Sequence, residues 1–312
     1  MIFAGTSQLA CQILISLISN SEKPIAILTL PDRRFGRKKI LQPLPVKRFA
    51  ERNDLRVFSP ENLQDQEFLD QIGQLNLDLL LVVDYGKMIP ESLIKLFHFR
   101  GINIHMSLLP RWRGATPIES ALLAGDKETG ISLIEISKNL DAGRILDQFP
   151  ISIQKDSTSG SLRRLLTEKS CEILPKFLRT FRKDHFKGAK EQSEEGICYC
   201  QKLTKESARI DWMKENSQIE RMIRAYNPKP GAFTGYQQNK ITITTAKVAD
   251  QENQSFQQPG TISKIKGNTI TVTCGYGDLE IQELQMAGKK SMTIREIQNG
   301  YRNFFQIGKL FK

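Results

Sequence analysis

The sequence lacks long hydrophobic runs, is poor in histidine and cysteine, and carries no dinucleotide-binding signature. No stretch of about 18 apolar residues occurs, so no membrane-spanning helix is expected. The five cysteines are odd in number and scattered, which excludes a disulfide framework and indicates a reducing compartment. Cys198 and Cys200 lie two residues apart but have only His185 nearby, too few ligands for a zinc site. Gly5 follows the first apolar run without a G-x-G-x-x-G pattern, so no nucleotide cofactor is expected.

The composition is that of a globular protein with more than one domain. Of the 312 residues, 39% are hydrophobic and 25% are charged, which excludes a wholly disordered chain. The N-terminus has no basic start and no signal-peptide cleavage site. Together with the reduced cysteines, this predicts a cytoplasmic protein that does not associate with membranes.

The spacing of apolar runs predicts two folds in succession. In the first half, short buried strands alternate with amphipathic helices, a pattern typical of an α/β domain with a doubly wound, mostly parallel sheet. After a polar stretch, short strands recur near 240–248, 260–265, 269–274 and 279–285, a spacing that suits a small β-barrel. Ser217 and Glu220 have the spacing of a capping box for a helix that ends near Tyr226. We expect domains at 1–184 and 207–312, joined by a linker at 185–206.

The positive charge is concentrated in two parts of the chain. The formal net charge is +11, yet residues 50–199 have slightly more acidic than basic residues. Residues 30–49 carry seven basic residues against one acidic residue, and residues 200–312 carry 17 against 10. A polyanion held at two places would suit this layout. A solvated, solubilising face is the alternative.

The strand expected at 101–106 carries the clearest chemical signal. Side chains alternate along a strand, so Asn103 and His105 share one face while Ile102 and Ile104 share the other. Two polar side chains in an otherwise buried strand are costly unless they are satisfied. At the carboxyl end of a parallel strand they would face the crevice where open α/β sheets bind ligands. A hydrogen-bonded core histidine is the structural alternative.

Two further segments extend this candidate site. The loop after the strand, residues 107–117, combines apolar residues, two prolines, a tryptophan and two arginines, and could hold a flat aromatic ligand with an anionic tail. Asp141 follows an apolar strand near 129–136 and could hydrogen-bond a histidine, fixing its tautomer and favouring its charged form. A solvated turn aspartate is the alternative.

These segments together resemble a known family, the methionyl-tRNA formyltransferases. The resemblance rests on Asn103-x-His105, Ser107-Leu-Leu-Pro110, Arg111-Trp-Arg-Gly-Ala115 and Leu140-Asp-x-Gly143. It extends to Gly36-Arg-x-Lys-Lys39, the segment from Leu203 to Trp212, and Gly288-Lys-Lys-x-Met292, so it runs nearly end to end. The chain departs from the usual family pattern at Asp84, Met106 and Arg144.

The resemblance implies a Rossmann-like formyltransferase domain, followed by an OB-like domain that binds tRNA. It implies transfer of a formyl group from 10-formyltetrahydrofolate to methionyl initiator tRNA, for translation initiation, by a monomeric bacterial enzyme. Amine attack on the formyl carbon passes through a tetrahedral intermediate and needs no metal. We expect Asn103 to stabilise the oxyanion and Asp141 to orient His105. His105 is expected to take the amine proton, to protonate the departing folate nitrogen or to polarise the formyl oxygen, and the sequence does not separate these roles.

The implied binding residues fall into two sets. The folate-binding stretch is Ser107, Leu108, Leu109 and Pro110. The tRNA contacts come mainly from a basic inserted loop, with two residues of the C-terminal region: Arg33, Arg34, Arg37, Lys38, Lys39, Lys205 and Arg209.

Two other functions fit parts of the sequence. A related formyl-folate enzyme acting on a sugar amine or a purine precursor would share the residues near 101–143. A catalytically silent tRNA-binding protein would share the basic regions. The basic loop favours a tRNA substrate, and the intact Asn103, His105 and Asp141 favour an enzyme.

Overall fold

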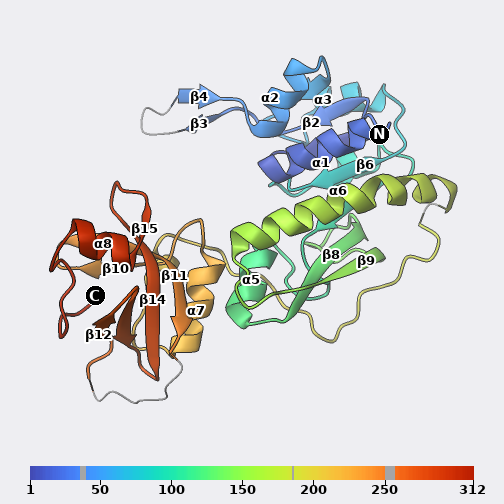
Figure 1. Ribbon diagram of the computed structural model, residues 1–312. Helices are drawn as coiled ribbons and strands as arrows, with labels where there is room; N and C mark the ends of the chain where they lie inside the picture. The colour runs from blue at the N-terminus through green and yellow to red at the C-terminus, as the bar shows by residue number, and fades with distance from the viewer. Residues whose placement is uncertain (36–39, 185, 250–256) are drawn as a thin grey trace. The chain divides into compact units, whose positions relative to one another are not determined.

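The chain divides into two compact units, each described here by itself. The structure is a computed structural model that describes residues 1–35, 40–184, 186–249 and 257–312 (Figure 1). The first unit comprises Met1–Pro117, Glu128–Ser152 and Arg163–Cys200, and the second comprises Ile118–Lys127, Ile153–Leu162 and Gln201–Lys312. Residues 186–200, which the sequence places in a linker, therefore group with the first unit.

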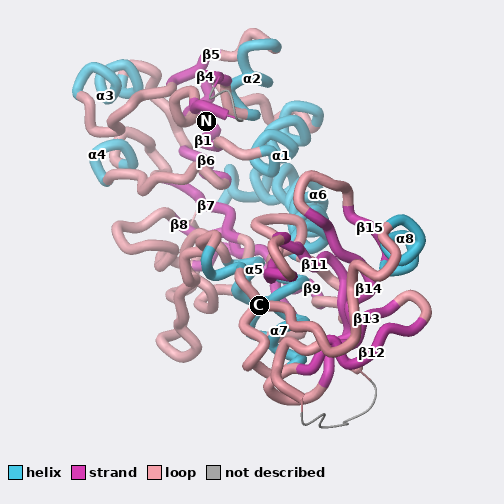
Figure 2. The backbone as a smooth tube through the Cα atoms, turned by 90° about the vertical axis from the view of Figure 1, so that its left-hand side faces the viewer, coloured by secondary structure: helices cyan, strands magenta, loops and turns pink. Residues whose placement is uncertain are grey.

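A seven-stranded sheet forms the core of the first unit, in the order β5-β2-β1-β6-β7-β8-β9. Figure 2 shows β1, β6, β7 and β8 following one another along it. The first five strands of this order pair in parallel and the last two are antiparallel, which confirms the predicted mostly parallel sheet. The bounds are β1 (Ile2–Gly5), β2 (Ala26–Leu28), β5 (Arg56–Phe58), β6 (Leu80–Val83), β7 (Gly101–His105), β8 (Glu128–Glu135) and β9 (Ile145–Ser152).

Helices connect these strands and cover the sheet. β1 and β6 are completely buried, as expected of parallel strands with both faces covered. The helix α1 starts after Ser7, whose hydroxyl accepts a hydrogen bond from the Ala10 backbone amide at 3.2 Å and so satisfies one unpaired donor of the first turn. The helices are α1 (Gln8–Ser19), α2 (Pro45–Arg52), α3 (Gln66–Gly73), α4 (Glu91–Ile94), α5 (Pro117–Ala124) and α6 (Ser159–Asp184).

The order of the strands fixes where a ligand can bind. β2 and β5 lie on one side of β1, whereas β6 and β7 lie on the other. In open α/β sheets, ligands bind outside the carboxyl ends of the strands, where the order reverses. The carboxyl end of β7, which carries Asn103 and His105, is therefore close to the expected binding edge.

A two-stranded hairpin occupies the basic segment of the first unit. β3 (Arg33–Phe35) pairs antiparallel with β4 (Ile40–Gln42) and extends away from the sheet (Figure 1). The sequence does not predict this hairpin, because the segment has no buried alternation: Ile40 and Leu41 are both more than half exposed. Arg37, Lys38 and Lys39 lie outside the described residues.

The second unit is built on an antiparallel sheet. Its path is β10-β11-β14-β13-β12, with β15 paired to β14. Close to the C-terminus, Phe311 bridges to Tyr236 in β10 and Leu310 bridges to Thr261, next to β12, so this segment links the two ends of the path. The expected OB-like domain is thus confirmed as an antiparallel β domain. The bounds are β10 (Phe233–Tyr236), β11 (Asn239–Val248), β12 (Ile262–Lys266), β13 (Thr269–Thr273), β14 (Asp278–Met286) and β15 (Ser291–Thr293).

The predicted capping box is wrong. In α7 (Asn216–Ala225) no side chain caps the first turn. The helix begins before Ser217, whose hydroxyl donates to Glu215, and Glu220 accepts hydrogen bonds from Arg224. A complete capping box occurs instead between Thr293 and Glu296, at the start of α8 (Ile294–Gly300). The remaining element is a 3₁₀ turn, η1 (Glu206–Ala208).

The described part of the chain contains no helix with both the length and the apolar character needed to cross a lipid bilayer.

Candidate active site

Asn103 and His105 project from the same face of β7, near its carboxyl end. β7 pairs with β6 on one side and with β8 on the other, so its backbone is fixed along both edges. His105 is 5% exposed, whereas Asn103 is half-buried. The alternation seen in the sequence therefore places the two side chains on one side of the sheet at different depths.

Asp141 joins them from the loop between β8 and β9. Its Oδ1 accepts a hydrogen bond from Asn103 Nδ2 at 3.2 Å, and its Oδ2 accepts one from the Gly114 backbone amide at 2.8 Å. Oδ2 also lies 3.5 Å from His105 Nδ1. The three predicted catalytic side chains thus form one cluster, although 38 residues separate Asn103 from Asp141.

Asp141 reaches this position through an unusual backbone turn. Its φ of 49° is left-handed, a conformation that aspartate tolerates better than most residues. Gly143 follows two residues later and approaches β8 so closely that an added Cβ would lie 1.7 Å from the carbonyl oxygen of Glu135. Only glycine fits there without moving the turn.

Gly143→Ala is therefore expected to displace the Asp141 turn. Forcing a methyl group into a packed site costs about 1–3 kcal/mol of unfolding free energy. Urea unfolding monitored by circular dichroism measures this loss. Gly73→Ala is the matched control, since the nearest atom to its added Cβ is 3.8 Å away. Equal stability of the two variants would contradict the expected clash.

Both ring nitrogens of His105 face oxygen atoms. Nε2 lies 2.8 Å from the Trp112 carbonyl oxygen, which can only accept a hydrogen bond, so Nε2 carries the proton of the neutral ring. Nδ1 then presents its lone pair toward Asp141. Burial lowers the pKa of His105 below its ordinary value, while Asp141 and the Trp112 carbonyl oppose this shift. The ring is thus neutral at rest, and an added proton on Nδ1 would face a carboxylate.

The loop after β7 is fastened tightly to the sheet. Ser107 Oγ donates to the Arg111 carbonyl at 2.6 Å, and Ser132 Oγ in β8 donates to the Ser107 carbonyl at 2.6 Å. The Ser132 hydroxyl also accepts from the Leu109 amide at 3.0 Å. Ser107 and Leu109, two of the four expected folate-binding residues, are therefore buried parts of the loop, while Leu108 and Pro110 are half-buried.

A segment that the sequence leaves as a linker also reaches the cluster. The Gln192 side-chain amide donates to the carbonyls of Asp141 and Gly143, both at 2.8 Å. Its oxygen accepts from Arg113 Nε and from a terminal nitrogen of the same guanidinium, at 3.1 and 2.7 Å. No local sequence signal marks Gln192, because its stretch is polar and has no periodicity.

The departures from the family pattern lie around this site. Asp84 follows β6, is exposed and has a φ of 46°. Met106 is 7% exposed and packs into the core. Arg144 forms an ion pair with Glu135, with its Nε 2.8 Å from a carboxylate oxygen, and this ion pair does not involve Asp141.

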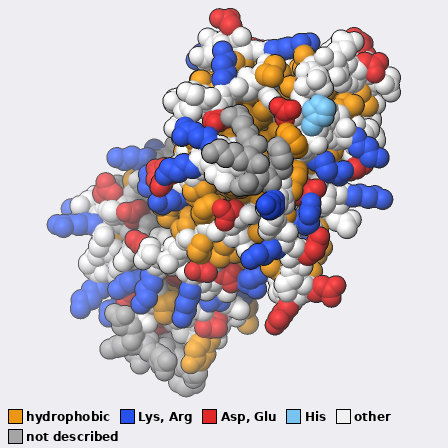
Figure 3. Space-filling view, turned by 90° about the vertical axis from the view of Figure 1, so that its right-hand side faces the viewer, with side chains coloured by type: hydrophobic (Ala, Val, Ile, Leu, Met, Phe, Trp, Pro, Cys, Tyr) orange, Lys and Arg blue, Asp and Glu red, His pale blue; other side chains and the backbone are white. Residues whose placement is uncertain are grey.

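The four expected tRNA-binding residues that the structure describes lie in two separate segments. Arg33 and Arg34 are exposed on β3, and Lys205 and Arg209 are exposed on either side of η1. On the face drawn in Figure 3, basic and acidic side chains are interspersed. Charge alone therefore does not mark one binding patch on that face.

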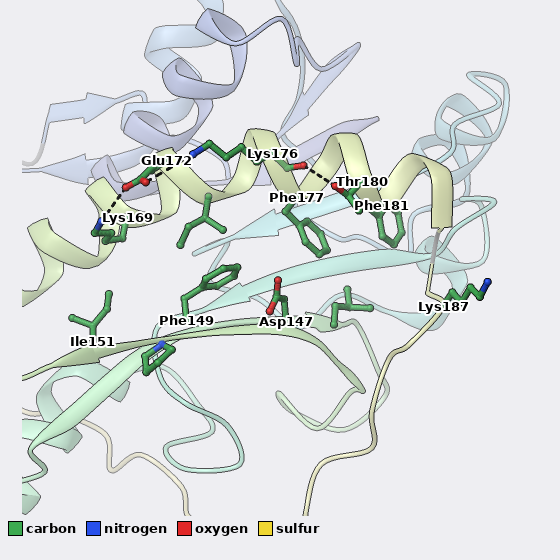
Figure 4. A pocket seen from close by; sticks show the side chains of 13 residues that line it. Asp147, Phe149, Ile151, Lys169, Glu172, Lys176, Phe177, Thr180, Phe181 and Lys187 are labelled. Atoms are coloured by element: carbon green, nitrogen blue, oxygen red, sulfur yellow. Dashed lines mark hydrogen bonds and ion pairs between the residues drawn. The ribbon is translucent and has the colours of Figure 1, made fainter.

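A cavity of about 700 Å³ lies elsewhere in the first unit, between α6 and β9 (Figure 4). Phe149 and Ile151 line it from the strand, and Phe177 lines it from the helix. None of the three clustered residues borders it. Among the residues that the structure describes, no group of three or more His, Cys, Asp and Glu side chains is arranged to hold a metal ion.

The chain matches models of two formyl transferase domains. Residues 1–178 match the formyl transferase model, and residues 202–302 match the formyl transferase C-terminal domain. Methionyl-tRNA formyltransferase from Methylococcus capsulatus is 38% identical over 301 residues, which cover 96% of each chain.

Solved structures share the fold at low identity. An N-formyltransferase from Helicobacter canadensis, in complex with folinic acid and dTDP-3-aminofucose, is 16% identical with a TM-score of 0.64, covering 91% of this chain and 98% of that one. HypX from Aquifex aeolicus, in complex with tetrahydrofolic acid, is 15% identical with a TM-score of 0.63 and covers all of this chain. This chain spans 50% of the HypX chain. The identity to the Methylococcus protein over nearly the full length, together with both domain matches, shows that the chain belongs to the methionyl-tRNA formyltransferase family.

Proposed function

We propose that this chain transfers the formyl group of 10-formyltetrahydrofolate to the amino group of methionyl initiator tRNA. The observation that supports this most is the cluster of Asn103, His105 and Asp141 at the carboxyl end of β7. It combines a donor for a developing oxyanion, a neutral imidazole and a carboxylate, the groups that acyl transfer to an amine requires.

Asn103 stabilises the tetrahedral intermediate. When the amine attacks the formyl carbon, the formyl oxygen becomes an oxyanion, and the Asn103 amide donates to it. The Asn103 amide has two N–H donors. One of them binds Asp141 Oδ1 at 3.2 Å and holds the amide in place before substrate arrives, and the other donates to the oxyanion. A preorganised donor of this kind contributes about 10²–10³ in rate.

His105 takes the proton that the amine loses. Since Nε2 is engaged with the Trp112 carbonyl, the lone pair on Nδ1 accepts the proton. The imidazolium then has Asp141 on one side and the Trp112 carbonyl on the other, and both stabilise its charge. The same proton can pass to the departing folate nitrogen when the intermediate collapses.

Ser107 to Pro110 and the basic residues bind the two substrates in this proposal. The rigid loop from Ser107 to Pro110 forms one wall for the folate, with Leu108 and Pro110 as its accessible side chains. Basic residues from two parts of the chain hold tRNA phosphates through counterion release. They are Arg33, Arg34, Arg37, Lys38, Lys39, Lys205 and Arg209.

Formylation of charged tRNA tests the proposal directly. Purified protein, 10-formyltetrahydrofolate and methionyl-tRNA should give formylmethionyl-tRNA, faster with initiator than with elongator tRNA. A nucleotide-linked amino sugar and a purine precursor amine are the comparison acceptors. Formylation of either of these, with none of the tRNA, would overturn the proposed substrate. No formylation of any acceptor, with tRNA still bound, would identify a silent tRNA-binding protein.

Charge reversal tests the basic loop. Changing Arg37, Lys38 and Lys39 to glutamate should raise KM for tRNA by at least tenfold. The slope of the logarithm of the binding constant against the logarithm of salt concentration should fall by the equivalent of about three phosphate contacts. KM for formyl-folate should not change. Glutamate at the exposed Lys23, Lys95 and Lys127 is the matched control. An unchanged tRNA KM in the loop variant would remove the loop from the binding surface.

We further propose that the enzyme works as a monomer in the bacterial cytoplasm, without a metal or nucleotide cofactor. None of the five cysteines forms a disulfide in the structure, as in a reducing compartment. Native mass measurement and formylation in the presence of a chelator test these points.

A further inference from the structure

Residues 190–200 contact the two residues whose oxygen atoms flank the His105 ring, through the backbone carbonyls of Asp141 and Trp112. One flanking group is the Asp141 carboxylate, 3.5 Å from Nδ1, and the other is the Trp112 carbonyl, 2.8 Å from Nε2. We propose that residues 190–200 act as a strap that positions His105 through these two groups, with Gln192 as the positioning residue. This rests on the proposed formyl transfer only for its activity readout.

Gln192 fixes the Asp141 side of the ring. Its amide group donates to two carbonyls of the Asp141 turn and accepts two hydrogen bonds from Arg113, so these four hydrogen bonds join the two catalytic loops. Arg113 is 7% exposed and follows Trp112 directly. One side chain thus ties the loop after β7 to the loop before β9.

Cys198 and Cys200 fix the Trp112 side of the ring. The Trp112 amide donates to Cys198 Sγ at 3.3 Å, and Cys200 Sγ donates to the Trp112 carbonyl at 3.3 Å. Backbone hydrogen bonds from the Arg113 amide to the Cys198 carbonyl, and from the Cys200 amide to the Arg113 carbonyl, reinforce this contact. The carbonyl that receives the Cys200 thiol is the same one that receives His105 Nε2.

The strap packs directly against the turn of the catalytic loop. Trp112 has a φ of 62°, a left-handed conformation that is strained for a residue with a Cβ, whereas the φ of 114° at Gly114 is one that glycine adopts readily. A Cβ added to Gly114 would lie 3.4 Å from the Cys200 Cβ. Cys200 therefore lies beside the turn whose Gly114 amide binds Asp141.

Loss of the Gln192 contacts should slow catalysis and move its pH dependence. In Gln192→Ala the Asp141 turn loosens, and a misplacement of about 1 Å costs on the order of 10² in kcat. Asp141 raises the pKa of His105 against the effect of burial. Weakening that contact should therefore shift the acidic limb of the kcat profile to lower pH, which a merely structural defect would not do. KM for both substrates should change less than threefold.

Two variants sharpen this test. Gln192→Glu keeps acceptors for Arg113 but replaces the donor to Asp141 and Gly143, so it should lose as much kcat as Gln192→Ala. Glu194→Gln makes the reverse exchange at an exposed position of the same segment and should behave as wild type. If the wild type is active and both Gln192 variants keep its kcat and its acidic pH limb, the strap proposal is overturned. Inactive wild type would instead count against the proposed function.

A thiol reagent tests the strap on the wild-type fold. Methyl methanethiosulfonate converts a cysteine thiolate into a methyl disulfide and releases methanesulfinate, so a modified Cys200 no longer donates to Trp112. Burial raises the pKa of the Cys11 and Cys171 thiols, and raises that of Cys274 to about 12, so these three thiols react slowly with the reagent.

The expected result is a fall of at least tenfold in kcat, reversed by dithiothreitol. A variant with serine at both Cys198 and Cys200 should keep its rate in the reagent. Mass spectrometry locates the modified residues. Full activity of wild-type protein carrying methyl disulfides at both positions would overturn the strap, whatever the Gln192 variants do.

Discussion

Alanine at position 105 is expected to lower kcat for formyl transfer by about 10²- to 10⁴-fold, with little change in KM for tRNA. The variant loses the group that takes the amine proton, whereas the tRNA is held by phosphate contacts elsewhere. Single-turnover formylation of methionyl-tRNA measures the chemical step directly.

His98→Ala is the matched control for this substitution. His98 is exposed and contacts Asn76 Oδ1 at 3.0 Å, away from β7. It should leave the single-turnover rate unchanged. A His105→Ala rate within threefold of wild type would remove His105 from the proton transfer.

The wild-type pH profile tests the same residue by a second route. Burial is the largest influence on the pKa of His105 and lowers it from the ordinary histidine value of about 6.5. The ring therefore stays neutral at pH values where a free histidine would be protonated. Single-turnover rates, corrected for the protonation of the substrate amine, should therefore hold steady down to pH 6.5 and fall only at lower pH. An acidic limb above pH 7 would mean that Asp141 raises the pKa of His105 by more than burial lowers it.

Asn103→Ala is expected to lower kcat by about 10²- to 10³-fold, because the oxyanion loses its donor. Asn103→Asp should be at least as damaging. It keeps the size of the side chain but faces Asp141 Oδ1 with a second carboxylate at the distance now spanned by a hydrogen bond. Single-turnover formylation is again the measurement.

Two comparisons separate lost chemistry from lost folding in these variants. Circular dichroism and urea midpoints should match wild type for Asn103→Ala, since the Asn103 side chain is only half-buried. KM for formyl-folate should also stay within about threefold. If Asn103→Ala and Asn103→Asp both retained the wild-type rate, the oxyanion role would pass to another donor.

The sequence predicted the parallel strands well because a strand buried on both faces is a nearly continuous run of apolar residues. Runs such as Leu80–Val83 and Gly101–His105 are apolar at almost every position that faces the core. Asn103 and His105 stood out for the same reason, since polar residues interrupt an otherwise buried strand. Alternation along the strand then sufficed to put them on one face.

Local patterns failed where a distant residue or an exposed setting decided the outcome. The Ser217 and Glu220 spacing predicted a capping box, but Arg224 binds Glu220 in the folded helix. The β3–β4 hairpin escaped detection because it buries too little for its residues to show a period.

By itself, the sequence determined where the buried parallel strands form and which polar side chains share a face, because these depend on periodicity over a few residues. Only the tertiary structure decided that Asp141 meets Asn103 and that Gln192 and Cys200 reach the partners of His105. Those contacts join segments that lie 38 to 88 residues apart, and they form because the sheet order and the path of residues 190–200 bring the loops together. No short-range pattern encodes that meeting.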